Sequence, residues 1–207
     1  MGDDFATGAC FYYRDVSLRI AGVLNGVVAI AGDKVGVIGM GGLGHMGVKF
    51  AKALGAEVTI FTRSEAKVAE AKKQGADHVI ISTDKEQMKA AADSFDFLLD
   101  TIPVAHDLNP YLKCLKYDGT HILVGLLTPI EPALQAGLLV TKRRVVAGSL
   151  IGGMPETQEV LDFCAEHDIT CDIEMLDIRN INEAYVRMKK GDVKYRFVID
   201  MKTLKEG

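Results

Sequence analysis

Short apolar runs rich in β-branched residues alternate, from Gly32 onward, with longer stretches whose apolar residues recur at helical spacing. This alternation is typical of a parallel sheet, because consecutive parallel strands need a long crossover connection, usually a helix. The predicted strands are Val35–Ile38, Val58–Phe61, Val79–Ile81, Phe95–Leu99, His121–Val124 and Val145–Val146. The predicted helices are Leu43–Leu54, Glu65–Gln74, Lys85–Ala92, Leu108–Lys116 and Pro155–His167. We therefore expect an α/β fold with a doubly wound, six-stranded parallel sheet.

The two ends of the chain do not follow this alternation. Residues 1–31 form a short lead-in segment whose apolar residues share one face of a possible amphipathic helix. Residues 171–207 form a C-terminal tail with a predicted strand, helix and strand at Ile173–Leu176, Ile181–Lys190 and Tyr195–Ile199. The sheet domain between them spans residues 32–170. Its helices are expected to end at glycines, which accept the left-handed conformation at little cost: Gly55, Gly75 and Gly119.

Composition excludes several classes of partner. The formal net charge of −4 argues against nucleic acid and membrane surfaces, which favour a basic protein face. No apolar run approaches the roughly 20 residues that span a bilayer, and Asp3 and Asp4 stand where a secretory signal carries basic residues. The cysteines are far apart without a CxxC pair, which favours reduced thiols: Cys10, Cys114, Cys164 and Cys171. We expect a protein of the cytoplasm.

A glycine-rich turn joins the first predicted strand to the first predicted helix. Gly39, Gly41 and Gly44 form a G-x-G-x-x-G pattern, and Gly42 and Leu43 lie within it. The three glycines suit a tight turn, a close approach of backbone to a pyrophosphate, and close packing of helix on strand. The helix N-terminus then offers unpaired N–H groups to the phosphates. The pattern predicts a Rossmann dinucleotide site; the alternative is a glycine-rich turn without a ligand.

His45 follows directly in the same helix. We interpret it as a neutral neighbour of the cofactor phosphates rather than as a base, because no acidic residue nearby in sequence orients its ring. The sequence therefore predicts no catalytic residue in this chain.

The end of the second predicted strand indicates which dinucleotide is preferred. A site that prefers NAD places an Asp or Glu about 20 residues beyond the turn to bind the adenosine ribose. Here Thr62, Arg63 and Ser64 occupy that position, and Lys67 follows one helical turn later. Hydroxyls, a guanidinium and an ammonium attract a 2′-phosphate, which favours NADP(H). The alternative is that Ser64 caps a helix with a solvated charged face.

At this point the chain resembles a known family. The segment from Val35 to Lys49 is similar to the cofactor domain of zinc-dependent medium-chain alcohol dehydrogenases, and Thr62-Arg63-Ser64 with Lys67 resembles the NADP-dependent cinnamyl alcohol dehydrogenase type. The resemblance covers roughly residues 32–202. Further matching segments are Leu108–Leu112, Gly148–Gly153 and Glu156–Glu159.

The resemblance implies further cofactor contacts at the ends of later strands. Thr101 and Ile102 would border the ribose and nicotinamide. Positions 124–126 would flank the nicotinamide, and two residues after the sixth strand would meet its carboxamide. These residues are Val124, Gly125, Leu126, Ser149 and Ile151. Ligands of open α/β sheets do bind beyond the carboxyl ends of strands. Read without the resemblance, Val124 and Ile151 are equally well explained as core residues.

The resemblance also implies a reaction, reversible hydride transfer between NADPH and an aldehyde, with zinc as Lewis acid. Full-length members hold zinc in a separate catalytic domain, through Cys, His and Glu residues. No such ligand cluster precedes Gly32, so we expect this chain to be the NADP(H)-binding portion, to bind no zinc, and to act on an aldehyde or alcohol only together with a catalytic domain. The alternatives are a stand-alone NADP(H) sensor or regulatory module and a zinc-free quinone or enone reductase.

The family's cofactor domains pair beside the sixth strand, and residues 134–147 match that region. Leu138, Leu139, Val140, Val145 and Val146 are interpreted as an apolar edge strand, which is a liability if it is left unpaired. The resemblance therefore favours a homodimer. The alternative is a monomer whose edge is solvated by polar residues, namely Gln135, Lys142, Arg143 and Arg144.

Overall fold

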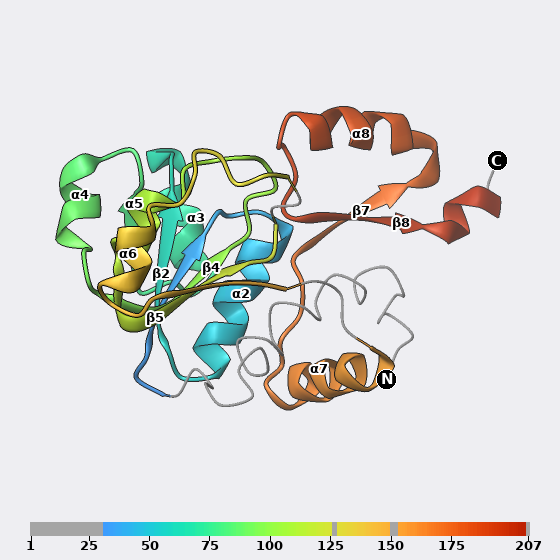
Figure 1. The fold of residues 1–207 in the computed structure, drawn as a ribbon. Coiled ribbons are helices and arrows are strands. Elements are labelled where there is room, and N and C mark those ends of the chain that lie inside the picture. The colour runs from blue at the N-terminus through green and yellow to red at the C-terminus, as the bar shows by residue number, and fades with distance from the viewer. Residues whose placement is uncertain (1–30, 126–127, 150–152, 206–207) are drawn as a thin grey trace.

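The six strands predicted from the sequence form one parallel sheet in the computed structural model, which describes residues 31–125, 128–149 and 153–205 (Figure 1). The strands are β1 (Lys34–Ile38), β2 (Glu57–Thr62), β3 (His78–Ile81), β4 (Phe95–Asp100), β5 (Leu115–Leu123) and β6 (Val145–Gly148). Their order is β3-β2-β1-β4-β5-β6, and every neighbouring pair is parallel. The order reverses between β1 and β4, which confirms the doubly wound arrangement.

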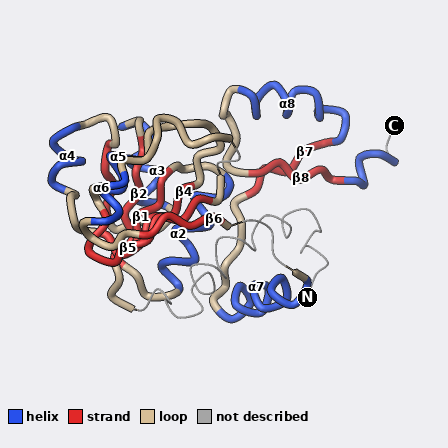
Figure 2. The backbone as a smooth tube through the Cα atoms, viewed as in Figure 1, coloured by secondary structure: helices blue, strands red, loops and turns tan. Residues whose placement is uncertain are grey.

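Helices connect the strands and cover both faces of the sheet (Figure 2). They are α2 (Gly42–Ala53), the 3₁₀ turn η1 (Glu65–Lys67), α3 (Val68–Lys73), α4 (Lys85–Ala90), α5 (Asn109–Leu112), α6 (Ala136–Val140) and α7 (Met154–Glu166). Gly55 and Gly75 follow helices with φ of +83° and +99°, so their predicted role as helix ends is confirmed.

Strand alternation divides the core into two clusters, one on each face of the sheet. Val35 and Val37 of β1 pack with Phe50 of α2 and with Val160 of α7. Ile38 of β1 belongs to the opposite cluster, which includes the following buried residues: Phe61, Phe95, Leu98, Tyr111 and Leu112. Burial on both faces explains why the central strands read as continuous apolar runs.

The tail forms a second, smaller sheet beside the first (Figure 1). It consists of β7 (Ile173–Asp177), the 3₁₀ turn η2 (Ile178–Asn180), α8 (Ile181–Lys189), β8 (Arg196–Asp200) and the 3₁₀ turn η3 (Met201–Lys205). β7 and β8 are parallel and pair only with each other among the described strands. The predicted strand, helix and strand are confirmed.

The region between β4 and β5 corrects two predictions. The helix predicted at Leu108–Lys116 is a single turn, α5, and β5 already begins at Leu115. Gly119 therefore lies inside β5 and ends no helix. Its role is close packing, since a Cβ there would lie 3.0 Å from the Leu115 Cβ. The helix stops because the Cys114 carbonyl is needed by the backbone N–H groups of Ser94 and Phe95, which begin the pairing of β4 with β5.

The apolar edge strand expected from Leu138 to Val146 is only partly a strand. Leu138, Leu139 and Val140 belong to the helix α6, and only Val145–Gly148 forms the edge strand. Leu138 and Leu139 pack against the second core cluster, and this packing favours a helical turn at this point.

The helices in the part of the chain that the structure describes are all too short or too polar to span a bilayer.

Candidate functional site

The glycine-rich turn after β1 combines two tightly packed glycines with one that faces open space. Gly39 has a φ of +94°, and a Cβ there would lie 2.9 Å from the Thr101 Oγ1. A Cβ on Gly44 would lie 2.2 Å from the Gly39 carbonyl oxygen, so no side chain fits. A Cβ added at Gly41 would have no heavy atom of the described residues within 4 Å. The packing therefore leaves a backbone cradle at Gly41 that an approaching ligand can fill.

The N-terminus of α2 opens on this cradle. Gly41 is its N-cap residue and supplies no side-chain hydrogen bond to the first N–H groups, and the first turn contains no acidic residue. Unpaired N–H groups and the positive end of a helix dipole attract anions. Residues 39–44 thus fit the pyrophosphate of a dinucleotide, with Gly42 and Leu43 in the first turn of the helix.

Three further strand ends meet beside this turn. The Thr101 hydroxyl donates to the Ile38 carbonyl at 2.9 Å, which ties the end of β4 to the end of β1. A Cβ on Gly125 would lie 2.6 Å from the Thr101 carbonyl, so the loop after β5 presses closely on the loop after β4. The Ser149 hydroxyl is buried without a hydrogen-bond partner among the described atoms.

The residues predicted to contact the ribose and nicotinamide therefore differ in what their side chains do. Thr101 and Gly125 lock the strand ends together, Val124 is half-buried behind them, and Ser149 holds an unsatisfied polar atom that a ligand could satisfy. Leu126 and Ile151 lie outside the described residues.

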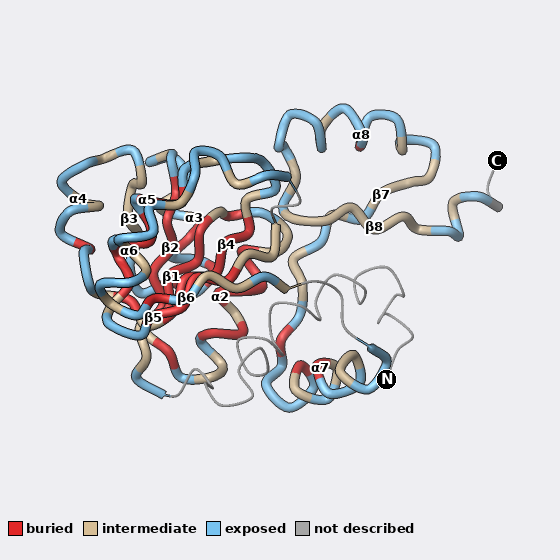
Figure 3. Tube along the Cα trace, in the orientation of Figure 1, coloured by how far each residue is buried: buried red, intermediate tan, exposed pale blue. Residues whose placement is uncertain are grey.

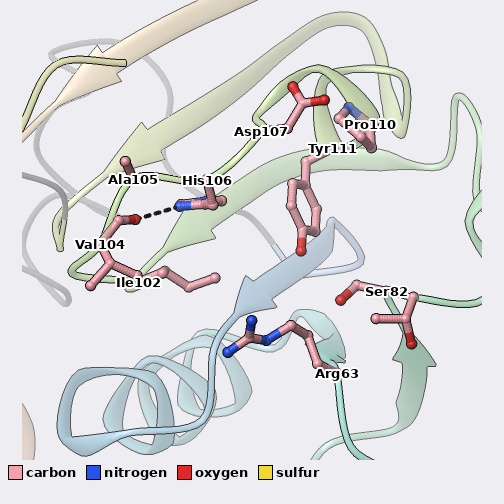
Figure 4. Close-up of a pocket in the computed structure, with 10 residues that line it drawn as sticks. Arg63, Ser82, Ile102, Val104, Ala105, His106, Asp107, Pro110 and Tyr111 are labelled. Atoms are coloured by element: carbon pink, nitrogen blue, oxygen red, sulfur yellow. Dashed lines mark hydrogen bonds between the residues drawn. The ribbon is translucent and has the colours of Figure 1, made fainter. Parts of the chain in front are cut away.

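The end of β2 borders a cavity of about 230 Å³ (Figure 4). Arg63 lies on one wall, with Ser82 from the end of β3 beside it and Tyr111 of α5 opposite. The loop after β4 supplies much of the remaining wall, through Ile102, Val104, Ala105 and His106. An exposed guanidinium over a partly apolar cavity is suited to a flat ring that carries an anionic substituent.

The other cationic and hydroxyl residues predicted here do not all face the cavity. The Thr62 side chain is buried, and its Oγ1 accepts the Ser64 backbone N–H at 3.3 Å, so Thr62 shapes the turn. Ser64 is half-buried at the N-cap of η1 and makes no cap hydrogen bond. Lys67 is exposed at the end of η1 and does not line the cavity.

Sequence reasoning missed a buried group at the end of β4. The Asp100 carboxylate is 0% exposed and accepts hydrogen bonds from His106 Nε2 at 2.8 Å and His121 Nε2 at 3.1 Å. Burial alone would raise the pKa of Asp100, but the hydrogen bonds from the two histidines outweigh burial and lower it. The available signal was a polar residue at the last position of an apolar strand, where ligands of such sheets bind.

His45 is fully buried in the first part of α2. Its ring stacks on Tyr195 with centroids 4.2 Å apart, and its Nδ1 lies 3.3 Å from the Gly41 carbonyl oxygen. Burial lowers the pKa of His45 to about 4, which keeps the ring neutral as the sequence predicts. Its observed role is to join the glycine-rich turn to the tail.

Metal ligands do not gather in the part of the chain that the structure describes. No group of three or more His, Cys, Asp or Glu side chains there is arranged to hold a metal ion, since His106 and His121 approach Asp100 as hydrogen-bond partners. The described residues therefore do not fit a zinc site.

Comparisons with known proteins agree with this architecture. The zinc-binding dehydrogenase family profile matches residues 42–166. "Aldehyde reductase YahK" of Escherichia coli K12 is 56% identical over 173 residues, which are 84% of this chain and 50% of that protein. "Probable cinnamyl alcohol dehydrogenase 1" of Aralia cordata is 47% identical over 178 residues, 85% of this chain and 49% of that protein. The chain thus spans about half the length of the curated relatives it matches.

Solved structures give the same result. A cinnamyl alcohol dehydrogenase from Sorghum bicolor superposes with a TM-score of 0.84 at 41% identity, covering 90% of this chain and 52% of that one. The corresponding enzyme from Helicobacter pylori, solved in complex with NADP(H), has a TM-score of 0.77 at 39% identity, covering 94% and 53%. The chain belongs to the zinc-binding dehydrogenase family and is related within it to the cinnamyl alcohol dehydrogenases.

Proposed function

We propose that this chain is the NADP(H)-binding portion of an alcohol dehydrogenase that transfers hydride reversibly between NADPH and an aldehyde. The observation that carries the proposal is the turn at residues 39–44, where Gly39 and Gly44 are packed and Gly41 opens on the start of α2. The relatives named for alcohol or aldehyde chemistry support the reaction class. The enzyme from Helicobacter pylori that was solved with NADP(H) supports the cofactor.

Each part of the proposed site has one task. The backbone N–H groups at the start of α2 would bind the pyrophosphate, and Arg63 would bind the adenosine end in the cavity. Val124, Gly125 and the buried Ser149 hydroxyl would receive the nicotinamide end, which supplies the hydride when it is bound. The close contact of Gly125 with Thr101 keeps these strand ends at fixed positions, so the nicotinamide would be oriented by a rigid surface.

A preference for NADP(H) follows from the charges at the end of β2. No carboxylate occupies residues 62–64, and the Arg63 guanidinium borders the cavity. A 2′-phosphate would gain a charge-assisted contact with Arg63, whereas a ribose hydroxyl would find no acidic acceptor at residues 62–64. Ser64 and Lys67, at the two ends of the neighbouring turn η1, would add to this attraction.

A matched pair of glycine substitutions tests the site. Among the described residues, nothing lies within 4 Å of a Cβ added at Gly41 or at Gly137, so alanine at either position should leave the fold intact. We expect Gly41→Ala to weaken NADPH binding by about thirty-fold or more, because the methyl group occupies the pyrophosphate position. Gly137→Ala, in α6, should bind NADPH as the unmodified chain does. Equal affinities of the two variants for NADPH, measured by isothermal titration, would overturn the proposed pyrophosphate site.

We propose further that this chain binds no stoichiometric zinc and by itself does not reduce cinnamaldehyde or other aldehydes with NADPH. Its described residues bring no metal ligands together. Elemental analysis and an NADPH oxidation assay test this directly. About one zinc per chain would refute the first part. Turnover that persists after chelation would instead favour the zinc-free reductase.

A homodimer in the cytoplasm completes the proposal. Val145 is 48% exposed on β6, which has β5 on one side and no described strand on the other. Pairing of two such edges would satisfy their free backbone groups. Sedimentation at micromolar concentration should give a dimer that Val145→Lys weakens, and a monomer for the unmodified chain would contradict the proposal.

A further inference from the structure

The Asp100 carboxylate is a buried charge directly behind the cavity. It sits at the last position of β4 and is 0% exposed. Its Oδ1 accepts the Ile102 N–H at 3.1 Å, and its Oδ2 faces His106 Nε2 at 2.8 Å and His121 Nε2 at 3.1 Å. A buried carboxylate is tolerated only when hydrogen bonds or a counter-charge replace its lost hydration. A positive charge on His106 therefore decides how much net negative charge lies there.

His106 is arranged to carry a positive charge. Its Nε2 faces the Asp100 carboxylate, and its Nδ1 lies 2.9 Å from the Val104 carbonyl oxygen. Both partners are acceptors only, so both ring nitrogens must donate, which requires the doubly protonated ring. His121 differs, because its Nδ1 is buried without a partner among the described residues, and a single proton on Nε2 satisfies it.

His106 also lines the cavity in which Arg63 lies (Figure 4). The hydrogen bond to Asp100 raises the pKa of His106, against burial and the nearby Arg63 charge, which oppose protonation. Asp100 and a protonated His106 form a neutral pair behind the cavity. Once His106 loses its proton, the Asp100 charge is left uncompensated beside any anion bound at Arg63.

We propose that His106, held by Asp100, is a specificity-determining residue for the adenosine 2′-phosphate. The site discriminates in favour of the phosphate while His106 is protonated and loses part of that discrimination when His106 is neutral. This inference rests on the proposed function of the site and assigns it a dependence on pH.

The other charged and titratable groups around His106 are accounted for. Asp107 lines the same cavity, but its Oδ1 accepts both the backbone N–H and the side-chain amide of Asn109, at 2.9 and 2.8 Å. Tyr111 meets the His106 ring edge to face at 6.1 Å, and burial raises the pKa of its hydroxyl, so it stays neutral. Arg63 remains a cation throughout. A variant of His106 that keeps all of these groups therefore isolates its own contribution.

Two small ligands report on the adenosine end alone. We would titrate the chain calorimetrically with 2′,5′-ADP and with AMP from pH 5.5 to pH 9, and take the ratio of the two affinities. The 2′-phosphate gains its second charge near pH 6, so the ratio should first rise with pH. In the unmodified chain it should then fall about ten-fold as His106 deprotonates. His106→Gln keeps a donor but no charge, and its ratio should rise to a lower plateau without falling.

His78 provides the matched control. It also pairs with a carboxylate, Glu57 Oε1 at 3.0 Å, but at the opposite ends of the strands. His78→Gln should reproduce the unmodified profile. Identical profiles for the unmodified chain and His106→Gln, with 2′,5′-ADP still preferred over AMP, would overturn the role of His106 and leave the proposed function standing. No preference for 2′,5′-ADP at any pH would overturn the phosphate site itself.

A measurement on the unmodified chain remains decisive if His106→Gln fails to fold. Because coupling between proton and ligand is reciprocal, saturating 2′,5′-ADP should raise the His106 pKa, followed by NMR of its ring proton, by more than AMP does. An equal His106 pKa with both ligands would contradict the proposal.

Discussion

The six-stranded sheet and the two-stranded tail are both parallel, yet they are stabilised in different ways. β1 is buried along four of its five residues, whereas every residue of β8 is only partly buried (Figure 3). The large sheet has helices on both faces, and its central strand β1 is accordingly apolar on both faces. The tail strands instead combine apolar residues with charged ones such as Glu174 and Arg196. Core burial defines the large sheet, while specific polar contacts must position the tail.

Those contacts converge on α2 and α3. The carboxylate of Asp172, just before β7, accepts hydrogen bonds from Lys49 Nζ and from Gln74 Nε2, both at 2.7 Å. Tyr195, just before β8, stacks on His45 and donates its hydroxyl to Glu70 Oε1 at 3.2 Å. The tail is thus attached to the glycine-rich turn and its neighbouring helices by a few identifiable side chains.

The largest expected difference between the two regions concerns truncation of an apolar side chain. Leu98 is 0% exposed at the centre of β4, whereas Met175 is 60% exposed on β7. Leu98→Ala should lower the free energy of unfolding by about 3 to 4 kcal/mol, because it removes buried area and leaves a cavity. Met175→Ala should cost less than about 0.5 kcal/mol. Similar losses for both variants in urea denaturation would show that the tail is as tightly packed as the sheet.

The same contrast explains what the sequence can predict. Continuous apolar strands such as Val35–Ile38 have few alternative structures, so the doubly wound arrangement and the positions of the strands follow from pattern and connection length. The helix predicted at Leu108–Lys116 is too long, because Leu115 also suits a buried strand and its pairing with Phe95 assigns it to β5. Local periodicity does not contain that long-range information.

The pH dependence of stability should depend on the His45–Tyr195 stack. Burial lowers the pKa of His45 to about 4 in the folded chain, against about 6.5 when unfolded. The unfolded state therefore binds more protons between these values, and stability falls as the pH falls. His45 should contribute a loss of about 2 kcal/mol between pH 7 and pH 5.

His45→Phe retains a ring that can stack on Tyr195 but cannot be protonated. Its free energy of unfolding should therefore be less sensitive to pH over this range by about the same 2 kcal/mol. Because all other titrating groups are shared, the difference between the two proteins isolates His45. Parallel pH profiles would contradict its buried, neutral state.

The smallest expected effect concerns the Tyr195 hydroxyl. Tyr195→Phe keeps the stacked ring and removes the hydrogen bond to Glu70, which should cost about 1 kcal/mol. Proteolysis within residues 171–207 should accelerate more than unfolding of the sheet, because the bond attaches the tail rather than the core. Unchanged proteolysis would place the attachment at Asp172 instead.

The candidate site was partly predictable for a similar reason. Gly39, Gly41 and Gly44 act through backbone geometry, which a short sequence pattern encodes directly. The carboxylate Asp100 and its partners His106 and His121 come from three separate positions in the chain, and only the folded sheet brings them together. Likewise, the turn alone cannot reveal that Thr62 is buried while Arg63 faces the cavity.

The most direct test of the account is the relative affinity of the unmodified chain for its two possible cofactors. Isothermal titration at pH 7 should give at least about ten-fold tighter binding of NADPH than of NADH, because Arg63 contacts a 2′-phosphate that NADH lacks. Arg63→Ala should reduce the difference in affinity between NADPH and NADH while leaving the affinity for NADH nearly unchanged. Equal affinities for the two cofactors, or tighter binding of NADH, would contradict the assignment of this chain as an NADP(H) site.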